Sequence, residues 1–164
     1  MHELQFHTFE PIFNEDSKIL VLGTFPSVKS REQGFYYGHA QNRFWRVVSQ
    51  LLGVSTPQCI DEKRDMLLKN NIALWDVAAS CEIVGSSDSS MKNVRANDIE
   101  RILSAAEIGR VFANGKTAAR LYERLIYPKS GVPIYTLPST SPANASYSLE
   151  RLIEEWSVIL PFIK

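Results

Sequence analysis

Four short apolar segments, separated by longer stretches with helical periodicity, constrain the fold of this chain more than any other feature. They run from Lys18 to Leu22, Ile72 to Asp76, Arg110 to Ala113 and Pro133 to Leu137. Apolar runs of this length are typical of strands that are buried on both faces. Strands that alternate with helices form a mostly parallel sheet covered by helices on both sides. The sequence therefore predicts an α/β fold, a three-layer α/β/α sandwich around a central, mostly parallel sheet of four strands.

Helical patterns lie between and after the predicted strands. The first of them starts at Asn42, places its apolar residues on one face, and ends at Gly53. Ser146 and Ser148 are candidate caps for the last of them. Three other patterns cover Ile60 to Asn70, Ala118 to Leu125, and Leu149 to Leu160. One more holds Ile99, Ile102 and Leu103 and can be capped by Asn97 or Asp98.

The length and composition favour one domain that spans residues 1–164. The chain has 164 residues, no internal repeat and no low-complexity linker. No apolar run approaches the ~20 residues of a membrane span, and the acidic N-terminal stretch is not typical of a signal peptide. The two cysteines, Cys59 and Cys81, lack metal-site spacing. We therefore expect a monomer in a reducing cytoplasm, without a metal or another cofactor.

The charge balance excludes a basic coat over the whole surface, because 18 Lys and Arg residues face 18 Asp and Glu residues. The charge is uneven, however. Between residues 18 and 46, Lys18, Lys29, Arg31, Arg43 and Arg46 stand against Glu32 alone. This pattern is compatible with a small footprint on a polyanion, and equally with an ordinary solvated face.

The segments that follow the predicted strands are the expected location of the chemistry, because ligands bind at the carboxyl ends of parallel strands. These segments are Gly23 to Ser27, Asp76 to Glu82, Asn114 with Gly115, and Pro138 to Asn144. None of them contains the glycine pattern of a phosphate loop, which argues against a mononucleotide-binding module.

A loop with three consecutive aromatic residues precedes the first helical pattern. It reads Gly34-Phe-Tyr-Tyr-Gly-His-Ala-Gln-Asn-Arg-Phe-Trp and contains Tyr37, His39, Asn42 and Arg43. A ring held in a loop can serve as a platform on which a nucleic-acid base stacks. The polar residues also have simpler interpretations: His39 as a backbone hydrogen-bond partner, Asn42 as a helix cap and Arg43 as half of an ion pair.

The segment after the last predicted strand places three hydroxyl groups between two prolines. Hydroxyl and backbone N–H groups bind phosphate oxygens without adding net charge, so this segment, which holds Ser139, Thr140, Ser141 and Asn144, is a candidate phosphate-binding loop. A simple Ser/Pro turn is the alternative.

Taken together, the segments GTFPS, GFYYGHAQNRFW, ALWDVAASCEIVGSSDSS and LPSTSPAN resemble the uracil-DNA glycosylase superfamily, and within it the hypoxanthine-DNA (deoxyinosine) glycosylases. The resemblance runs from about Leu22 to Trp156. It implies a monofunctional glycosylase that flips a deaminated base, chiefly hypoxanthine, out of double- or single-stranded DNA and hydrolyses its N-glycosidic bond in base excision repair. The alternatives are a mismatch-specific uracil-DNA glycosylase and a non-catalytic α/β module that binds a nucleotide or a protein.

The resemblance also implies roles for individual residues. Asn42 matches the asparagine proposed to be catalytic in the hypoxanthine branch, and Tyr37 matches the aromatic residue that stacks on the base. Phe25 stands where the mismatch-specific enzymes have a water-activating asparagine, and Leu137 where uracil enzymes often have histidine. Asp76 ends the second predicted strand, where uracil enzymes place the asparagine that reads the base. We therefore expect Phe25, Tyr37 and Asp76 to bind the base, and Asp76 to accept a hydrogen bond from N1–H of hypoxanthine. Because the resemblance implies a DNA substrate, we expect the DNA backbone to be contacted by Arg43, Ser139, Thr140, Ser141 and Asn144.

Overall fold

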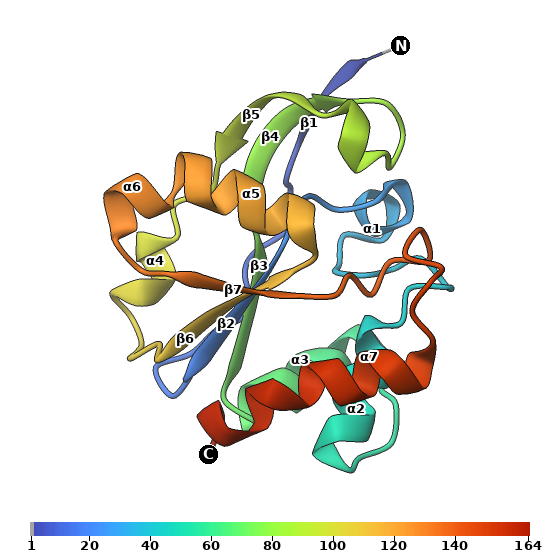
Figure 1. Ribbon diagram of the computed structural model, residues 1–164, viewed down its shortest axis with the longest axis vertical. Coiled ribbons are helices and arrows are strands. Elements are labelled where there is room, and N and C mark those ends of the chain that lie inside the picture. Colours follow the sequence, from blue (N-terminus) through green and yellow to red (C-terminus); the bar gives the residue numbers. More distant parts are fainter. Residues whose placement is uncertain (1) are drawn as a thin grey trace.

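A parallel sheet of four strands forms the centre of the computed structural model, which describes residues 2–164 (Figure 1). Its strands are β2 (Ile19–Gly23), β3 (Ile72–Asp76), β6 (Arg110–Asn114) and β7 (Ile134–Leu137), in the order β3-β2-β6-β7. All neighbouring pairs are parallel. Every residue of β2 and β3 is buried. The four strands predicted from the apolar runs are confirmed, with ends that differ by at most one residue.

Helices cover both faces of this sheet, as Figure 1 shows with the sheet seen nearly edge-on. On one side lie α2 (Phe44–Leu52), α3 (Ile60–Lys69) and α7 (Leu149–Trp156), and on the other lies α5 (Lys116–Leu125) with the shorter α4 (Glu100–Leu103) and α6 (Tyr127–Ser130). The predicted three-layer arrangement is therefore confirmed. The remaining helical segments are α1 (Val28–Gln33), the 3₁₀ turn η1 (Asp88–Ser90) and the C-terminal η2 (Ser157–Phe162).

A second sheet, which the sequence did not predict, lies beside the central one. It is antiparallel and has the order β1-β4-β5, with β1 at Glu3–Phe6, β4 at Ala78–Ile83 and β5 at Lys92–Ala96. Its edge strands contain no continuous apolar run, and most of their side chains are exposed. The sheet matters for function because β1 leads directly into His7, which reaches the end of β3.

The helix predicted after Asn97 begins later than expected. The Asn97 side chain donates to the carbonyl oxygens of Asp76, at 2.8 Å, and Ala78, at 3.2 Å. Asn97 therefore joins the two sheets, and α4 starts at Glu100 without a side-chain cap. The last helix has the expected cap, since Ser148 Oγ accepts from the N–H of Arg151 at 3.1 Å.

None of the helices in residues 2–164 is long and apolar enough to span a bilayer. Both cysteines are free thiols: Cys59 is exposed and Cys81 is buried.

Candidate active site

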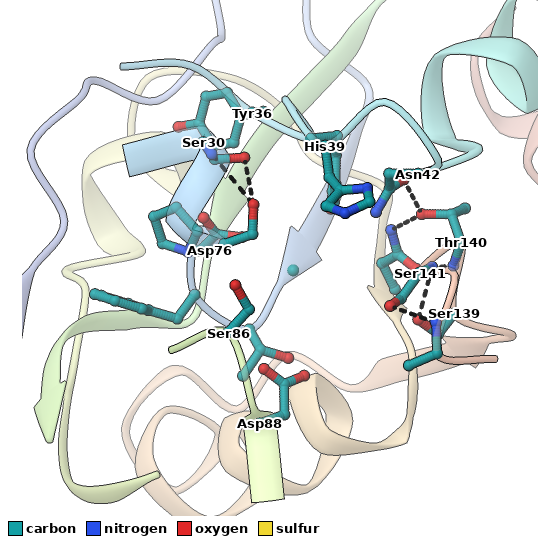
Figure 2. A pocket seen from close by; sticks show the side chains of 18 of the residues that line it. Ser30, Tyr36, His39, Asn42, Asp76, Ser86, Asp88, Ser139, Thr140 and Ser141 are labelled. Atoms are coloured by element: carbon teal, nitrogen blue, oxygen red, sulfur yellow. Dashed lines mark hydrogen bonds between the residues drawn. The ribbon is translucent and has the colours of Figure 1, made fainter. Parts of the chain in front are cut away.

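A pocket lies at the carboxyl ends of β2, β3 and β6 (Figure 2). These ends contribute Gly23, Asp76 and Asn114, and the wall is completed by the loops that follow β2 and β7 and by the connection between β4 and β5. Most of the residues predicted for the site meet here, namely Phe25, Tyr37, Asn42, Asp76, Ser139, Thr140 and Ser141. Arg43 and Asn144 lie outside the lining.

Asn42 stands at the start of α2, and its carbonyl oxygen is fully engaged. Asn42 Oδ1 accepts the N–H of Phe44 at 2.9 Å and the hydroxyl of Thr140 at 2.9 Å. The first bond closes a turn just before α2, and the N-cap residue of this helix is Arg43, so the simple interpretation of Asn42 as the helix cap is wrong by one position. The amide nitrogen takes no part in either bond and lies on the pocket side, next to His39 in Figure 2.

The direction of the Asn42 amide is fixed by Thr140 and Asn114. Asn114 Oδ1 accepts the backbone N–H of Thr140 at 3.0 Å, so the NH₂ of Asn114 must donate to Thr140 Oγ1, also at 3.0 Å. The Thr140 hydroxyl proton is then left for Asn42 Oδ1. Because each group has only one available role, the relay leaves the NH₂ of Asn42 as a donor toward the pocket.

Thr140 differs from its predicted role. Its exposed fraction is 0%, and both its N–H and its hydroxyl are used inside the protein. It therefore cannot touch a DNA phosphate, and its side chain positions Asn42 instead. The sequence pattern of three adjacent hydroxyls gave no sign that the middle one would be turned inward.

Arg43 orders the loop between β7 and α7. Its guanidinium donates to the carbonyl oxygens of Ser141, at 2.9 Å, Asn144, at 3.1 Å, and Tyr147. The Asn144 side chain in turn donates to the carbonyl of Ser139 at 3.0 Å. Arg43 and Asn144 thus shape the loop, and a direct contact of either with DNA stays a prediction.

Ser139 and Ser141 lie on the pocket wall, and the hydroxyl group of each can still donate a hydrogen bond. Ser139 Oγ accepts the N–H of Ser141 at 3.1 Å, and Ser141 Oγ accepts the N–H of Ala143 at 3.1 Å. In both cases the hydroxyl proton remains free to bind an oxygen of a phosphate or sugar.

The Asp76 carboxylate is oriented by His7, a residue that the sequence analysis missed. His7 Nε2 donates to Asp76 Oδ2 at 2.8 Å, and both side chains are almost completely buried. The His7 ring packs against Phe9 and Phe25. Only the second carboxylate oxygen, Oδ1, is left for a ligand. No local pattern could reveal this pair, because 69 positions separate its members in the chain.

Gly23 leaves room for the Asp76 carboxylate because it has no side chain. A Cβ at this position would lie 2.4 Å from Asp76 Oδ1 and 2.8 Å from the Tyr37 hydroxyl oxygen. The absence of a side chain at the end of β2 therefore lets both polar groups approach the floor of the pocket.

Tyr37 has one ring face covered and a hydroxyl without a partner. The ring stacks on Phe44 with centroids 4.3 Å apart. The hydroxyl is buried and forms no hydrogen bond within the described residues. Burial and the nearby charge of Asp76 raise the pKa of Tyr37, so the phenol is neutral. Tyr37 is half-buried and lines the pocket, and stacking of its ring on a base stays a prediction.

Phe25 and Asp88 complete the site on the side of the second sheet. Phe25 is buried, with the Arg31 guanidinium 5.5 Å from its ring centroid. Asp88 opens η1 and lines the same pocket. Asp88 is exposed to solvent on its outer side, while the protein atoms around it and the charge of Asp76 raise the pKa of its carboxyl to about 6. Within residues 2–164, no group of three or more His, Cys, Asp or Glu side chains is arranged to hold a metal ion.

Residues 10–159 match the Uracil DNA glycosylase superfamily. The chain belongs to this superfamily. Within it, the chain is 34% identical over 153 residues to the hypoxanthine DNA glycosylase of Methanosarcina acetivorans, covering 92% of this chain and 95% of that one. It is 31% identical over 138 residues to the hypoxanthine DNA glycosylase of Methanosarcina barkeri, covering 83% and 86%.

A solved member of the superfamily has the same fold. The solution NMR structure of a proposed uracil DNA glycosylase from Methanosarcina acetivorans superimposes with a TM-score of 0.79 at 31% identity. The match covers 94% of this chain and 96% of that chain. The resemblance inferred from the sequence motifs is therefore confirmed at the level of the superfamily and of the fold.

Proposed function

We propose that this protein is a monofunctional DNA glycosylase that removes deaminated bases, chiefly hypoxanthine, from DNA by hydrolysis. The single observation that carries the proposal is the relay from Asn114 through Thr140, which aims the Asn42 amide into a pocket at the strand ends. The names of the two curated relatives support the choice of hypoxanthine.

The pocket has the groups that hydrolysis of an N-glycosidic bond requires. The transition state carries positive charge on the sugar and moves negative charge into the base, so it needs little activation of the attacking water. The NH₂ of Asn42 can donate to the water oxygen and hold it against C1′ without adding charge. No lysine lines the pocket within the described chain, which favours attack by water over a covalent imine intermediate.

The free oxygen of Asp76 supports recognition of hypoxanthine. A carboxylate only accepts hydrogen bonds, so it can take N1–H of hypoxanthine but opposes the unprotonated N1 of adenine. His7 leaves Oδ1 as the available acceptor. The second ring face of Tyr37 can stack on the flipped base, at ~1–3 kcal/mol per stacked base.

Ser139 and Ser141 are the side chains that we propose for the DNA backbone, since their hydroxyl protons are free. The substrate is double- or single-stranded DNA, from which the base is flipped into the pocket. We further propose that the enzyme acts as a monomer in the cytoplasm.

Uracil is the second candidate base, because the solved relative is described as a proposed uracil enzyme. Phe25 argues against it, since this position holds the water-activating asparagine in the mismatch-specific branch. A non-catalytic binding module is the third possibility, and the superfamily match over residues 10–159 weighs against it.

One assay separates the three. Matched duplexes with a single inosine, a single uracil or neither are incubated with the protein, and abasic sites are revealed by strand cleavage in hot alkali. We expect cleavage chiefly at inosine, with free hypoxanthine detected by chromatography. Cleavage chiefly at uracil would identify the mismatch-type enzyme, and intact strands throughout would identify a binding module.

A further inference from the structure

The electrostatics of the pocket are unfavourable for the base as it leaves. When the glycosidic bond breaks, both electrons of the bond go to the base, which becomes an anion unless it is protonated. The described lining contains two carboxyl groups, Asp76 and Asp88, and neither Lys nor Arg. Two ionised carboxylates would repel the departing anion, so the site works best when one of them is neutral and gives its proton to the base.

The environments of the two carboxyl groups differ. Asp76 already accepts a hydrogen bond from His7 at 2.8 Å, which fits the role of acceptor. Asp88 forms no ion pair within the described residues. Figure 2 shows it beside Ser86, on the opposite side of the pocket from Asn42 and His39. The raised pKa of its carboxyl, about 6, agrees with a group that holds a proton close to neutral pH.

We propose that Asp88 is the general acid of this enzyme and protonates the departing base. The inference rests on the proposed glycosylase function. The proton moves from the Asp88 carboxyl to a ring nitrogen or the oxygen of the base, and the glycosidic electron pair stays with the base. Water adds to C1′ and releases one proton to solvent, and a proton from solvent restores Asp88. The sum is hydrolysis, with no further reactant.

Other titratable and charged groups around Asp88 come from several elements. The charge of Asp76 helps to raise the pKa of Asp88. His39 is the competing candidate for the acid, since it lines the pocket and its Nδ1 accepts the N–H of Gln41 at 3.1 Å, which leaves Nε2–H as a donor. The remaining groups near the Asp88 loop are His2, Arg31, Tyr37 and Cys81.

The test is the pH profile of hypoxanthine release under single-turnover conditions between about pH 5 and about pH 9, a range on both sides of the Asp88 pKa of about 6. Wild type is compared with Asp88→Asn, Asp88→Ala and His39→Gln, and with Ser87→Ala as a control on the same exposed loop. We expect the wild-type rate to fall about tenfold per pH unit above the pKa of the acid. Both Asp88 variants should be slow at pH 6 and should lose this dependence, whereas Ser87→Ala should follow wild type.

The outcomes are distinguishable. If wild type releases no hypoxanthine at any pH, the proposed function fails and the inference with it. If wild type is active and Asp88→Asn keeps its rate and profile, Asp88 is not the acid. If His39→Gln alone removes the pH dependence, the acid is His39 and the inference about Asp88 is overturned. Thermal unfolding of each variant verifies that the fold is unchanged.

Discussion

Thr140 gives Asn42 one of the two hydrogen bonds that orient its amide group. Replacing Thr140 by valine keeps the shape but removes the hydroxyl that accepts from Asn114 and donates to Asn42. We expect the free energy of unfolding to fall by about 1–3 kcal/mol, because a buried NH₂ loses its acceptor. The single-turnover rate should fall at least about tenfold, because the Asn42 amide keeps only the hydrogen bond from Phe44 and is held less precisely.

Thr140→Ser is the matched control, since it keeps the hydroxyl and removes only a methyl group. It should retain most of the rate while losing about 1 kcal/mol of stability. Equal rates for the valine and serine variants would show that the relay does not position Asn42.

Two variants of Tyr37 distinguish the contribution of its ring to base release from that of its hydroxyl. The Tyr37 hydroxyl is buried without a hydrogen-bond partner, so Tyr37→Phe should raise the free energy of unfolding by about 1 kcal/mol. In Tyr37→Phe the ring still stacks on Phe44, so we expect the rate of base release to change by less than about threefold. Tyr37→Ala removes the ring and should lose the ~1–3 kcal/mol that stacking on a base contributes. Chemical unfolding and single-turnover kinetics measure both effects. A large loss in the phenylalanine variant would mean that the hydroxyl contacts the substrate.

At the scale of elements, the close approach of β2 and β3 determines where Asp76 can lie. A methyl group on Gly23 would lie 2.4 Å from Asp76 Oδ1, so Gly23→Ala must displace the carboxylate. We expect hypoxanthine release to fall at least about tenfold, since misplacement of a reacting or binding group by 1 Å can cost about 10²-fold. Gly109→Ala is the control, because its Cβ would meet only the Lys18 carbonyl at an ordinary 3.6 Å. Similar rates for the two variants would remove Asp76 from the recognition of the base.

The central sheet could be predicted from the sequence, and the second sheet could not. All of β2 and β3 is buried, which leaves a continuous apolar run, whereas Leu4 and Phe6 in β1 are each 59% exposed. The same contrast holds for the site. Tyr37 and Asp76 were found because they stand in or near strand-end loops with recognisable motifs. His7 and Asp88 were missed because their positions depend on the second sheet, and Asn114 was noted only as a strand-end residue.

At the scale of the whole molecule, the charge distribution limits the affinity for DNA. The net charge is zero, and several of the basic residues between positions 18 and 46 are already engaged. Lys29 Nζ lies 3.6 Å from Glu32 Oε2. The guanidinium groups of Arg31 and Arg43 donate to backbone carbonyl oxygens. Few cations therefore remain for phosphates. We expect weak binding in which the logarithm of affinity falls with the logarithm of salt concentration, with a slope of about −3, or about three phosphates at −0.9 each.

Fluorescence anisotropy with a labelled duplex, measured over a series of salt concentrations, gives this slope. A slope near −9, equivalent to about ten neutralised phosphates, would reveal a basic surface that the charge distribution does not indicate.

The most direct test of the whole account is the rate at which Asn42→Ala releases hypoxanthine from an inosine duplex, measured under single-turnover conditions beside wild type. Wild type should leave abasic sites and free hypoxanthine, and the variant should lose at least about 100-fold in rate, or about 2.7 kcal/mol of transition-state stabilisation. DNA affinity should change little, whereas the free energy of unfolding should fall by about 1–3 kcal/mol, because the Thr140 hydroxyl and the Phe44 N–H lose their acceptor. A loss below about tenfold would leave Asn42 with only the structural role of its side-chain oxygen, which accepts from Phe44 and Thr140, and would contradict the proposed catalytic role.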